Sequence, residues 1–224
     1  DVTLAIQRHS TALSNASFYG WISVHQGDSV HQAHAHFDAA VSAATRAFKT
    51  WSETSCHERS KILYSIARHI QKYARLFAVL ESMDNGKTIR ETRDIDIPLV
   101  ARHFYHHAGW ADKVSALLST LNPVASTYVN YSKTRAMGVI VAAPNPKDGL
   151  LGMVEAICAA TVMCNSVILL LEHEAGEQAI ALAEALATCD MPAGVINILT
   201  TDVASVLGVA MRHDDVDAIY LASN

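Results

Sequence analysis

The fold of this chain is decided by residues 138–171, which read GVIVAAPNPKDGLLGMVEAICAATVMCNSVILLL. Two short apolar runs, at residues 137–143 and 167–171, predict buried strands, and the apolar stretch 150–163 between them predicts a helix. Short strands that alternate with a helix of this length are typical of a parallel sheet with a crossover connection. The stretch therefore predicts a Rossmann-like βαβ unit.

The same alternation continues to the end of the sequence. Helices are predicted at 177–188 and 203–211, and strands at 195–199 and 218–221. We therefore assign residues 137–224 to a Rossmann-like parallel sheet with crossover helices. Bridging strands are expected within residues 127–135, and the apolar run 128–131 predicts one of them. The predicted fold class is α/β.

The first half of the chain has a helical pattern instead. Apolar residues recur at three- and four-residue steps and predict helices at 29–51, 57–83 and 90–117, within a helical region 29–118. Asn85 and Gly86 tolerate a positive φ and mark the end of the second helix. Residues 1–28 show no period, apart from a short strand expected at 18–24, and are predicted to form an amino-terminal arm.

Composition limits the classes of partner. With 50% hydrophobic and 17% charged residues among 224, the chain can bury a large core, and its low charge fraction suggests that another subunit or domain covers part of the surface. The formal net charge is −5 and no dense Lys/Arg run occurs, which argues against nucleic acid and anionic membrane as main partners. The longest apolar run, residues 156–171, is too short and too interrupted to span a bilayer.

The cysteines indicate a reducing compartment, such as the cytoplasm or the mitochondrial matrix. No CxxC pair occurs, and we interpret the four as reduced core residues: Cys56, Cys158, Cys164 and Cys189. The sequence starts at Asp1 without a charged-then-apolar leader, so we expect targeting information to be absent or already removed.

The turn after the first predicted Rossmann strand lacks the GxGxxG pattern that cradles a pyrophosphate. Pro144, Asn145, Pro146, Lys147, Asp148 and Gly149 stand there instead. Taken alone, the residues indicate an α/β protein with the topology of a nucleotide-binding fold and no phosphate-binding turn.

Four segments carry a family resemblance: residues 47–52 with Glu58-Arg59 following, residues 80–87 (LESMDNGK), residues 108–113 (AGWADK), and Asn130-Tyr131 leading to Gly138-Val139. In order and spacing, the match resembles the amino-terminal half of the NAD(P)-dependent aldehyde dehydrogenases over residues 38–224. The PxGVxN string at 192–197 and the DVD at 215–217 also fit that family. The resemblance implies a Rossmann-like cofactor domain, with no gap needed from Gly138 onward.

The resemblance also identifies the positions where chemistry is expected. The family's Pro-Trp-Asn-Phe-Pro motif, whose Asn donates to the oxyanion formed from the aldehyde, falls on residues 145–149 and places Lys147 at the Asn position. A long ammonium side chain is not a preorganised amide, and Asp148 beside it would compete. A slipped loop would instead bring Asn145 to the site.

The cofactor positions differ as well. The family lysine that binds the adenosine ribose falls on Leu170, with Glu172 as an alternative acceptor for the ribose hydroxyls, and the family's glycine-bearing turn falls on Thr201, Asp202 and Val203. Its Phe-Thr-Gly-Ser falls on residues 221–224. We therefore expect vestigial cofactor positions at Ala143, Pro144, Lys147, Leu170, Thr201 and Asn224, with no cofactor bound and no catalytic residue assigned.

The expected function is a degenerate, non-catalytic module with a structural or assembly role in a homo- or hetero-oligomer. It resembles the truncated second module of two-module aldehyde dehydrogenases, with the catalytic domain absent and with residues 128–133 in the family's oligomerisation segment. The alternative is the cofactor-binding part of an active enzyme that oxidises an aldehyde to an acid with NAD or NADP. Its catalytic Cys and Glu would then lie outside this sequence.

The remaining polar and aromatic clusters are interpreted structurally. The two histidine groups, at 25, 31, 34 and 36 and at 103, 106 and 107, have spacings that could gather a metal, but we interpret them as partly exposed helix residues and predict no metal site. Residues 84–87 are interpreted as a helix-end turn, and Phe104, Tyr105 and Trp110 as core.

Overall fold

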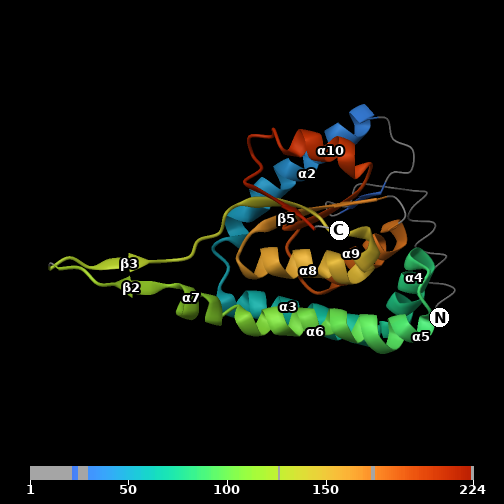
Figure 1. Cartoon of the computed structure of the whole chain (residues 1–224), viewed down its shortest axis with the longest axis horizontal. Helices are drawn as coiled ribbons and strands as arrows, with labels where there is room; N and C mark the ends of the chain where they lie inside the picture. The colour runs from blue at the N-terminus through green and yellow to red at the C-terminus, as the bar shows by residue number, and fades with distance from the viewer. Residues whose placement is uncertain (1–21, 25–29, 126, 173–174, 223–224) are drawn as a thin grey trace.

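A computed structural model describes residues 22–24, 30–125, 127–172 and 175–222 (Figure 1). The helical first half contains α2 (Val30–Trp51), α3 (Cys56–Lys72), α4 (Ala74–Asn85), α5 (Ile89–Glu91), a π-helical turn (Thr92–Asp96), α6 (Ile97–Trp110) and α7 (Lys113–Leu118). The second half alternates strands and helices: β4 (Val139–Ala143), α8 (Gly149–Val162), β5 (Ser166–Leu171), α9 (Gly176–Thr188), β6 (Ile196–Thr200), α10 (Val203–Ala210) and β7 (Ala218–Leu221). The predicted α/β class is confirmed.

The sheet is a parallel Rossmann half with one added strand. Its order is β1-β6-β5-β4-β7, so the four strands of the second half lie in the order 3-2-1-4 of a doubly wound fold. The register pairs Val141 of β4 with Ile168 of β5 and with Ile219 of β7. The added strand β1 (Ile22–Val24) lies within the predicted amino-terminal arm and pairs in parallel with β6.

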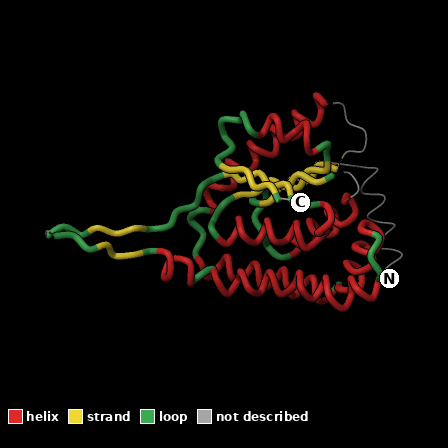
Figure 2. The backbone as a smooth tube through the Cα atoms, in the orientation of Figure 1, coloured by secondary structure: helices red, strands yellow, loops and turns green. Residues whose placement is uncertain are grey.

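The sheet is covered on both faces, as the near-continuous burial of its strands requires. Helices α8 and α9 lie on one face, with α3 and α6 packed beyond them, while α2 and α10 lie on the other (Figures 1 and 2). Each side has its own apolar core: Leu63, Phe104, Ile157 and Leu169 belong to the first, and Phe37 and Leu170 to the second.

A two-stranded arm projects from this body (Figures 1 and 2). It consists of β2 (Thr120–Asn122) and β3 (Asn130–Ser132), which pair in antiparallel with Leu121 opposite Tyr131. The strand predicted at 128–131 is thus present and shifted toward residue 132, whereas β2 was not predicted. A three-residue strand that is exposed on both faces carries too short an apolar pattern to be recognised.

Two predicted helices are interrupted. The helix predicted at 57–83 is divided at Tyr73, whose φ of −106° and ψ of 24° end α3, and whose ring packs back on His69. The helix predicted at 90–117 contains the π-helical turn and a break after Trp110. Pro98 has no N–H, and its ring would meet the carbonyl of Asp94 in a regular α-helix, so the backbone widens there.

Burial corrects two further predictions. Cys158 and Cys189 are buried, but Cys56 is exposed and Cys164 half-buried, so the prediction of four core cysteines is wrong for Cys56. Phe104 is buried as predicted, whereas Trp110 is exposed. No helix in the described part of the chain is long and apolar enough to cross a membrane.

Candidate functional site

Of the predicted site positions, Ala143 and Thr201 lie at one edge of the sheet, where the carboxyl ends of the parallel strands lie together. Ala143, the last residue of β4, pairs with Leu221 at the end of β7, and its carbonyl accepts a 3.1 Å hydrogen bond from the Ala222 N–H. Leu171 at the end of β5 accepts a 2.8 Å bond from the Thr201 N–H. The strand order reverses between β4 and β7, and ligands of open α/β sheets bind at such a point.

The loop from β4 to α8 covers this edge and contains Lys147. Residues Pro146–Asp148 form a 3₁₀ turn, and the Asn145 side-chain oxygen accepts the Lys147 backbone N–H at 3.1 Å. Asn145 is therefore used to cap its own loop. The Lys147 side chain is exposed, and it forms no ion pair with Asp148 or any other described residue.

Gly149 joins this loop to α8 in a conformation that side-chain-bearing residues rarely adopt. Its φ is 53° and its ψ −131°. A Cβ built on Gly149 would lie 2.0 Å from Asn85 Nδ2 and 2.4 Å from Glu81 Oε1, so the backbone is pressed against α4. The path of the loop thus depends on glycine at this position.

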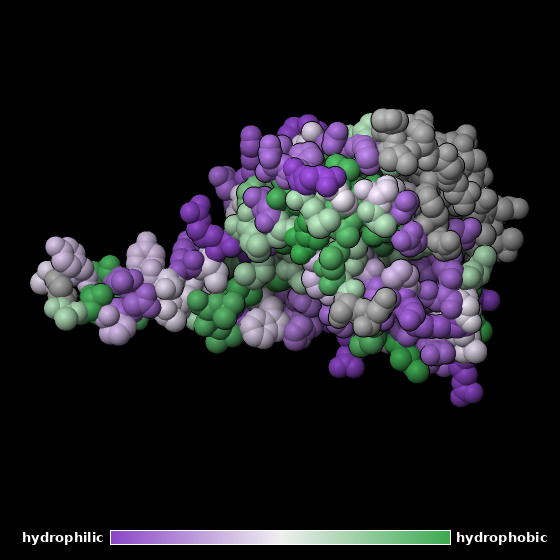
Figure 3. All heavy atoms as spheres, turned by 45° about the horizontal axis from the view of Figure 1, so that its top comes forward, coloured by the Kyte–Doolittle hydropathy of each residue, from purple (hydrophilic) through white to green (hydrophobic). Residues whose placement is uncertain are grey.

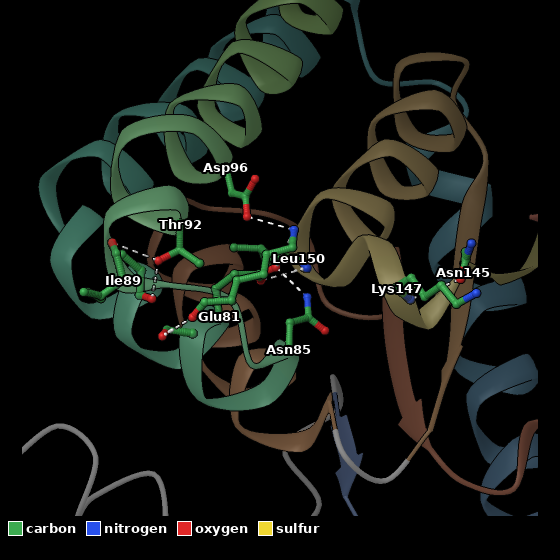
Figure 4. Close-up of polar contacts among 11 residues, drawn as sticks. Glu81, Asn85, Ile89, Thr92, Asp96, Asn145, Lys147 and Leu150 are labelled. Carbon is green, nitrogen blue, oxygen red and sulfur yellow. Dashed lines mark hydrogen bonds and ion pairs between the residues drawn. The ribbon is translucent and has the colours of Figure 1, made fainter.

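Glu81 holds the first turn of α8 in place. Its side chain is 1% exposed, and its carboxylate accepts the Leu150 N–H at 3.0 Å and the Asn85 amide at 2.7 Å (Figure 4). The N–H groups of a first helical turn have no partner within the helix, so this carboxylate satisfies one of them and interacts favourably with the helix dipole. Lys87 Nζ lies 3.9 Å from Glu81 Oε1 and 2.9 Å from Asp96 Oδ2.

Burial raises the pKa of Glu81, against the lowering effects of the Leu150 and Asn85 hydrogen bonds and of Lys87. The two hydrogen bonds and the nearby Lys87 ammonium favour the charged form of this carboxylate and so offset part of the cost of burying it. No role for Glu81 was predicted from the sequence. The sequence feature that indicates the burial of Glu81 is its position four residues after the buried Phe77, which puts an acidic side chain on the face that α4 turns to the core.

Asp84 is a second unusual carboxyl group on α4, facing the start of α9. Desolvation raises its pKa to about 7, the Gln178 backbone N–H lowers it, and Glu177 and Glu81 raise it further. Its Oδ2 is buried without a hydrogen-bond partner. Residues 84–87 are a helix-end turn as predicted, with Gly86 in the left-handed region at φ 66°, but the turn also carries this buried polar cluster.

Leu170, at the predicted ribose-binding position, does not reach the edge as a polar group would. It is 1% exposed and belongs to the apolar core between the sheet and helices α2 and α10, with Phe37, Leu199 and Val206. Thr201, in the place of the family's glycine-bearing turn, is buried, and the Thr200 hydroxyl next to it has no hydrogen-bond partner. Pro144 is half-buried, and Asn224 lies outside the described residues.

The histidines of α6 are partly exposed, as predicted: His103 and His107 are half-buried and His106 is exposed. Within the described ranges, no three or more His, Cys, Asp or Glu side chains are arranged as a metal centre. His25 lies outside the described residues, and nothing is described of the His31 side chain.

Known proteins are similar to this chain over nearly all of its length. The model of the aldehyde dehydrogenase family matches residues 24–223. A mitochondrial aldehyde dehydrogenase of Leishmania tarentolae is 31% identical over 185 residues, which are 83% of this chain and 36% of the relative.

Solved structures agree in fold. PnpE from Pseudomonas sp. WBC-3, solved with nicotinamide adenine dinucleotide, superposes with a TM-score of 0.79 at 27% identity, covering 84% of this chain and 38% of PnpE. The NAD⁺ complex of an aldehyde dehydrogenase from Bacillus cereus gives a TM-score of 0.78 at 25% identity over 85% of this chain and 39% of that chain. The chain thus spans less than two fifths of the length of these relatives.

Proposed function

The chain belongs to the aldehyde dehydrogenase family, and we propose that it keeps the fold of the family's cofactor-binding half without a working dinucleotide site. In this proposal the segment is a non-catalytic module with a structural role in an assembly. It explains why the framework of the sheet is retained while the polar residues at its carboxyl edge are replaced.

The observation that carries the proposal is the burial of Leu170. The resembled family has a lysine at this position that binds the ribose hydroxyls, and a leucine that is 1% exposed within an apolar core offers them no donor. Loss of such a charge-assisted hydrogen bond costs about 1.5–3 kcal/mol of binding free energy. Glu172, the alternative acceptor, lies beside residues outside the described ranges.

The loop after β4 supports the same conclusion. The family motif ends in a proline, and Gly149 stands at that position. Proline fixes φ near −65° and cannot adopt the φ of 53° seen at Gly149. The loop therefore follows a path that the family motif cannot follow. Lys147 stands at the position of the oxyanion-binding Asn, exposed and without a preorganised amide.

The arm supports the assembly role. Apolar side chains on it are largely exposed, among them Leu121 at 76%, Val129 at 76% and Tyr131 at 69% (Figure 3). An isolated two-stranded hairpin is only marginally stable in water, so contact with a protein partner would stabilise the arm and cover these side chains. The proposed partner is a second copy of this chain or a related subunit.

One alternative has an observation in its favour. The carboxyl ends of β4 and β7 still lie at a reversal of strand order, which is where open α/β sheets bind their ligands, and PnpE was solved with a dinucleotide. The alternative function is the NAD(P)-binding part of an active aldehyde dehydrogenase whose catalytic Cys and Glu lie outside these residues. A longer transcript that encodes both residues after position 224 would favour this alternative.

Binding of NADH provides the test. Energy transfer from protein tryptophan to bound NADH is measured for the wild type and for Leu170→Lys, with unfolding curves to establish that each is folded. The proposal expects no saturable signal below about 1 mM NADH for the wild type. A wild type that saturates in the micromolar range would overturn it.

A further inference from the structure

The charges of this chain are divided unequally between its two halves. Residues 137–224 contain 11 Asp and Glu against 2 Lys and Arg, which is a formal net charge of −9. Residues 1–136 contain 15 Lys and Arg against 11 Asp and Glu, which is a net charge of +4. A chain with a net charge of −5 therefore combines a strongly acidic part with a basic one, and such a distribution guides how proteins meet.

The outer side of the α3 and α6 pair is basic. Arg68 and Lys72 of α3 and Arg102 of α6 are exposed, and none of the three forms an ion pair within the described residues. Glu58 is the only acidic residue in the two helices, and its carboxylate lies 3.4 Å from Lys61 Nζ. Three positive charges on this side are thus left without a partner in the chain.

Two tyrosines join α3 to α6 on the same side. The rings of Tyr64 and Tyr105 have centroids 5.4 Å apart, and the Tyr105 hydroxyl donates a 2.8 Å hydrogen bond to the Gln71 side-chain oxygen. Arg68 follows Tyr64 by four residues and Arg102 precedes Tyr105 by three, so each arginine shares a side of its helix with a tyrosine. Tyr and Arg are enriched in protein interfaces and their hot spots. We call this surface the basic face: Tyr64, Arg68, Lys72, Arg102 and Tyr105.

The loop between α10 and β7 is acidic, since residues 211–217 contain three aspartates and one arginine. Asp214 and Asp215 are exposed and form no ion pair within the described part of the chain. Asp38 of α2 adds a carboxylate beside this loop, with Oδ1 3.7 Å from His213 Nε2. Helices α2 and α10 lie on the other side of the sheet from α3 and α6, so the acidic loop and the basic face are on opposite sides of the molecule (Figure 1).

We propose that the basic face binds the acidic loop of a second copy of this chain. Opposite charges on opposite sides cannot pair within one copy, but they become complementary when two copies stack head to tail. Such a contact is heterologous, so each assembly keeps one open basic face and one open acidic loop at its ends. This interface is separate from the arm and does not depend on the loss of the dinucleotide site.

Sedimentation velocity of the full chain at two salt concentrations tests this interface. Salt screens exposed charges, so the wild type should form larger species in about 20 mM NaCl than in about 500 mM NaCl at the same protein concentration. Association through the apolar side chains of the arm should persist in high salt, because apolar contacts are not screened. The salt-sensitive species therefore reports the basic face alone.

Charge reversal locates the interface. Arg68→Glu combined with Lys72→Glu should remove the salt-sensitive species, and so should Asp214→Lys combined with Asp215→Lys. The aspartate substitutions reduce the net negative charge, so they would strengthen association if only net charge mattered. All four substitutions in one chain make the two surfaces complementary again and should restore the larger species.

Arg46→Glu combined with Lys49→Glu is the matched control, because both residues are exposed on α2 and the net charge changes as it does for the basic-face pair. This control should retain the salt-sensitive species. Three results would overturn the proposal: a wild type of the same size in both salts, an equal loss in the control, or a folded four-substitution chain that stays small. Urea unfolding curves show whether each variant is folded, and Arg68→Gln with Lys72→Gln repeats the test if charge reversal prevents folding.

Discussion

The Glu81 carboxylate accepts a 3.0 Å hydrogen bond from the Leu150 N–H across 69 residues of sequence, and so ties α4 to the first turn of α8. Glu81→Ala would leave this N–H and the Asn85 amide buried without their shared acceptor. We expect a loss of about 2–3 kcal/mol in the free energy of unfolding, measured with urea. The exposed Glu53→Ala serves as the control, with an expected change within about 0.5 kcal/mol. Equal effects of the two substitutions would refute this role of Glu81.

Gly149 depends on the same contact. Gly149→Ala would force a residue with a Cβ to φ 53° and into the Glu81 and Asn85 side chains, so we expect it to cost about 2 kcal/mol or more. Gly109→Ala is the matched control, because no atom lies within 4 Å of a Cβ at this helical position, and alanine there should stabilise the protein slightly. A Gly149→Ala variant as stable as Gly109→Ala would mean that the loop does not follow this path.

Asp84 should make stability depend on pH. Its pKa is about 7 in the folded protein against 3.8 as a model value, so the folded state binds more protons in this range and stability falls as the pH rises from about 4 to above 7. Asp84→Asn should therefore gain stability relative to the wild type at pH 8 more than at pH 5. Urea midpoints of both proteins at the two pH values measure this difference. A difference that is the same at both pH values would be inconsistent with the raised pKa.

Some features of this fold could be predicted from the sequence and others could not. The order of strands and helices after Pro123 was predictable because each element carries its own apolar period, and the site edge followed because parallel strands end together. The hydrogen bond between Glu81 and Leu150 was not predictable, because nothing in the sequence near either residue specifies a partner 69 positions away. The break at Tyr73 was missed because no Gly or Pro interrupts the apolar stripe there. Strand β2 was missed because three residues, two of them exposed, are too few to show a period.

The arm should be needed for assembly and not for the stability of the body. Tyr131→Lys combined with Leu121→Lys places charge on side chains that are 69% and 76% exposed, so folding should be unaffected while association weakens. Sedimentation velocity should then show a smaller species than the wild type, with an unchanged urea midpoint. A wild type that is already a stable monomer at high concentration would argue against the assembly role.

The most direct measurement of the central claim is a calorimetric titration of the folded chain with NAD and with NADP, run beside PnpE, which was solved with nicotinamide adenine dinucleotide. Because Leu170 is buried in an apolar core and Lys147 is exposed on an altered loop, we predict that neither dinucleotide binds with a Kd below about 1 mM. Saturable binding of either one in the micromolar range would contradict the account.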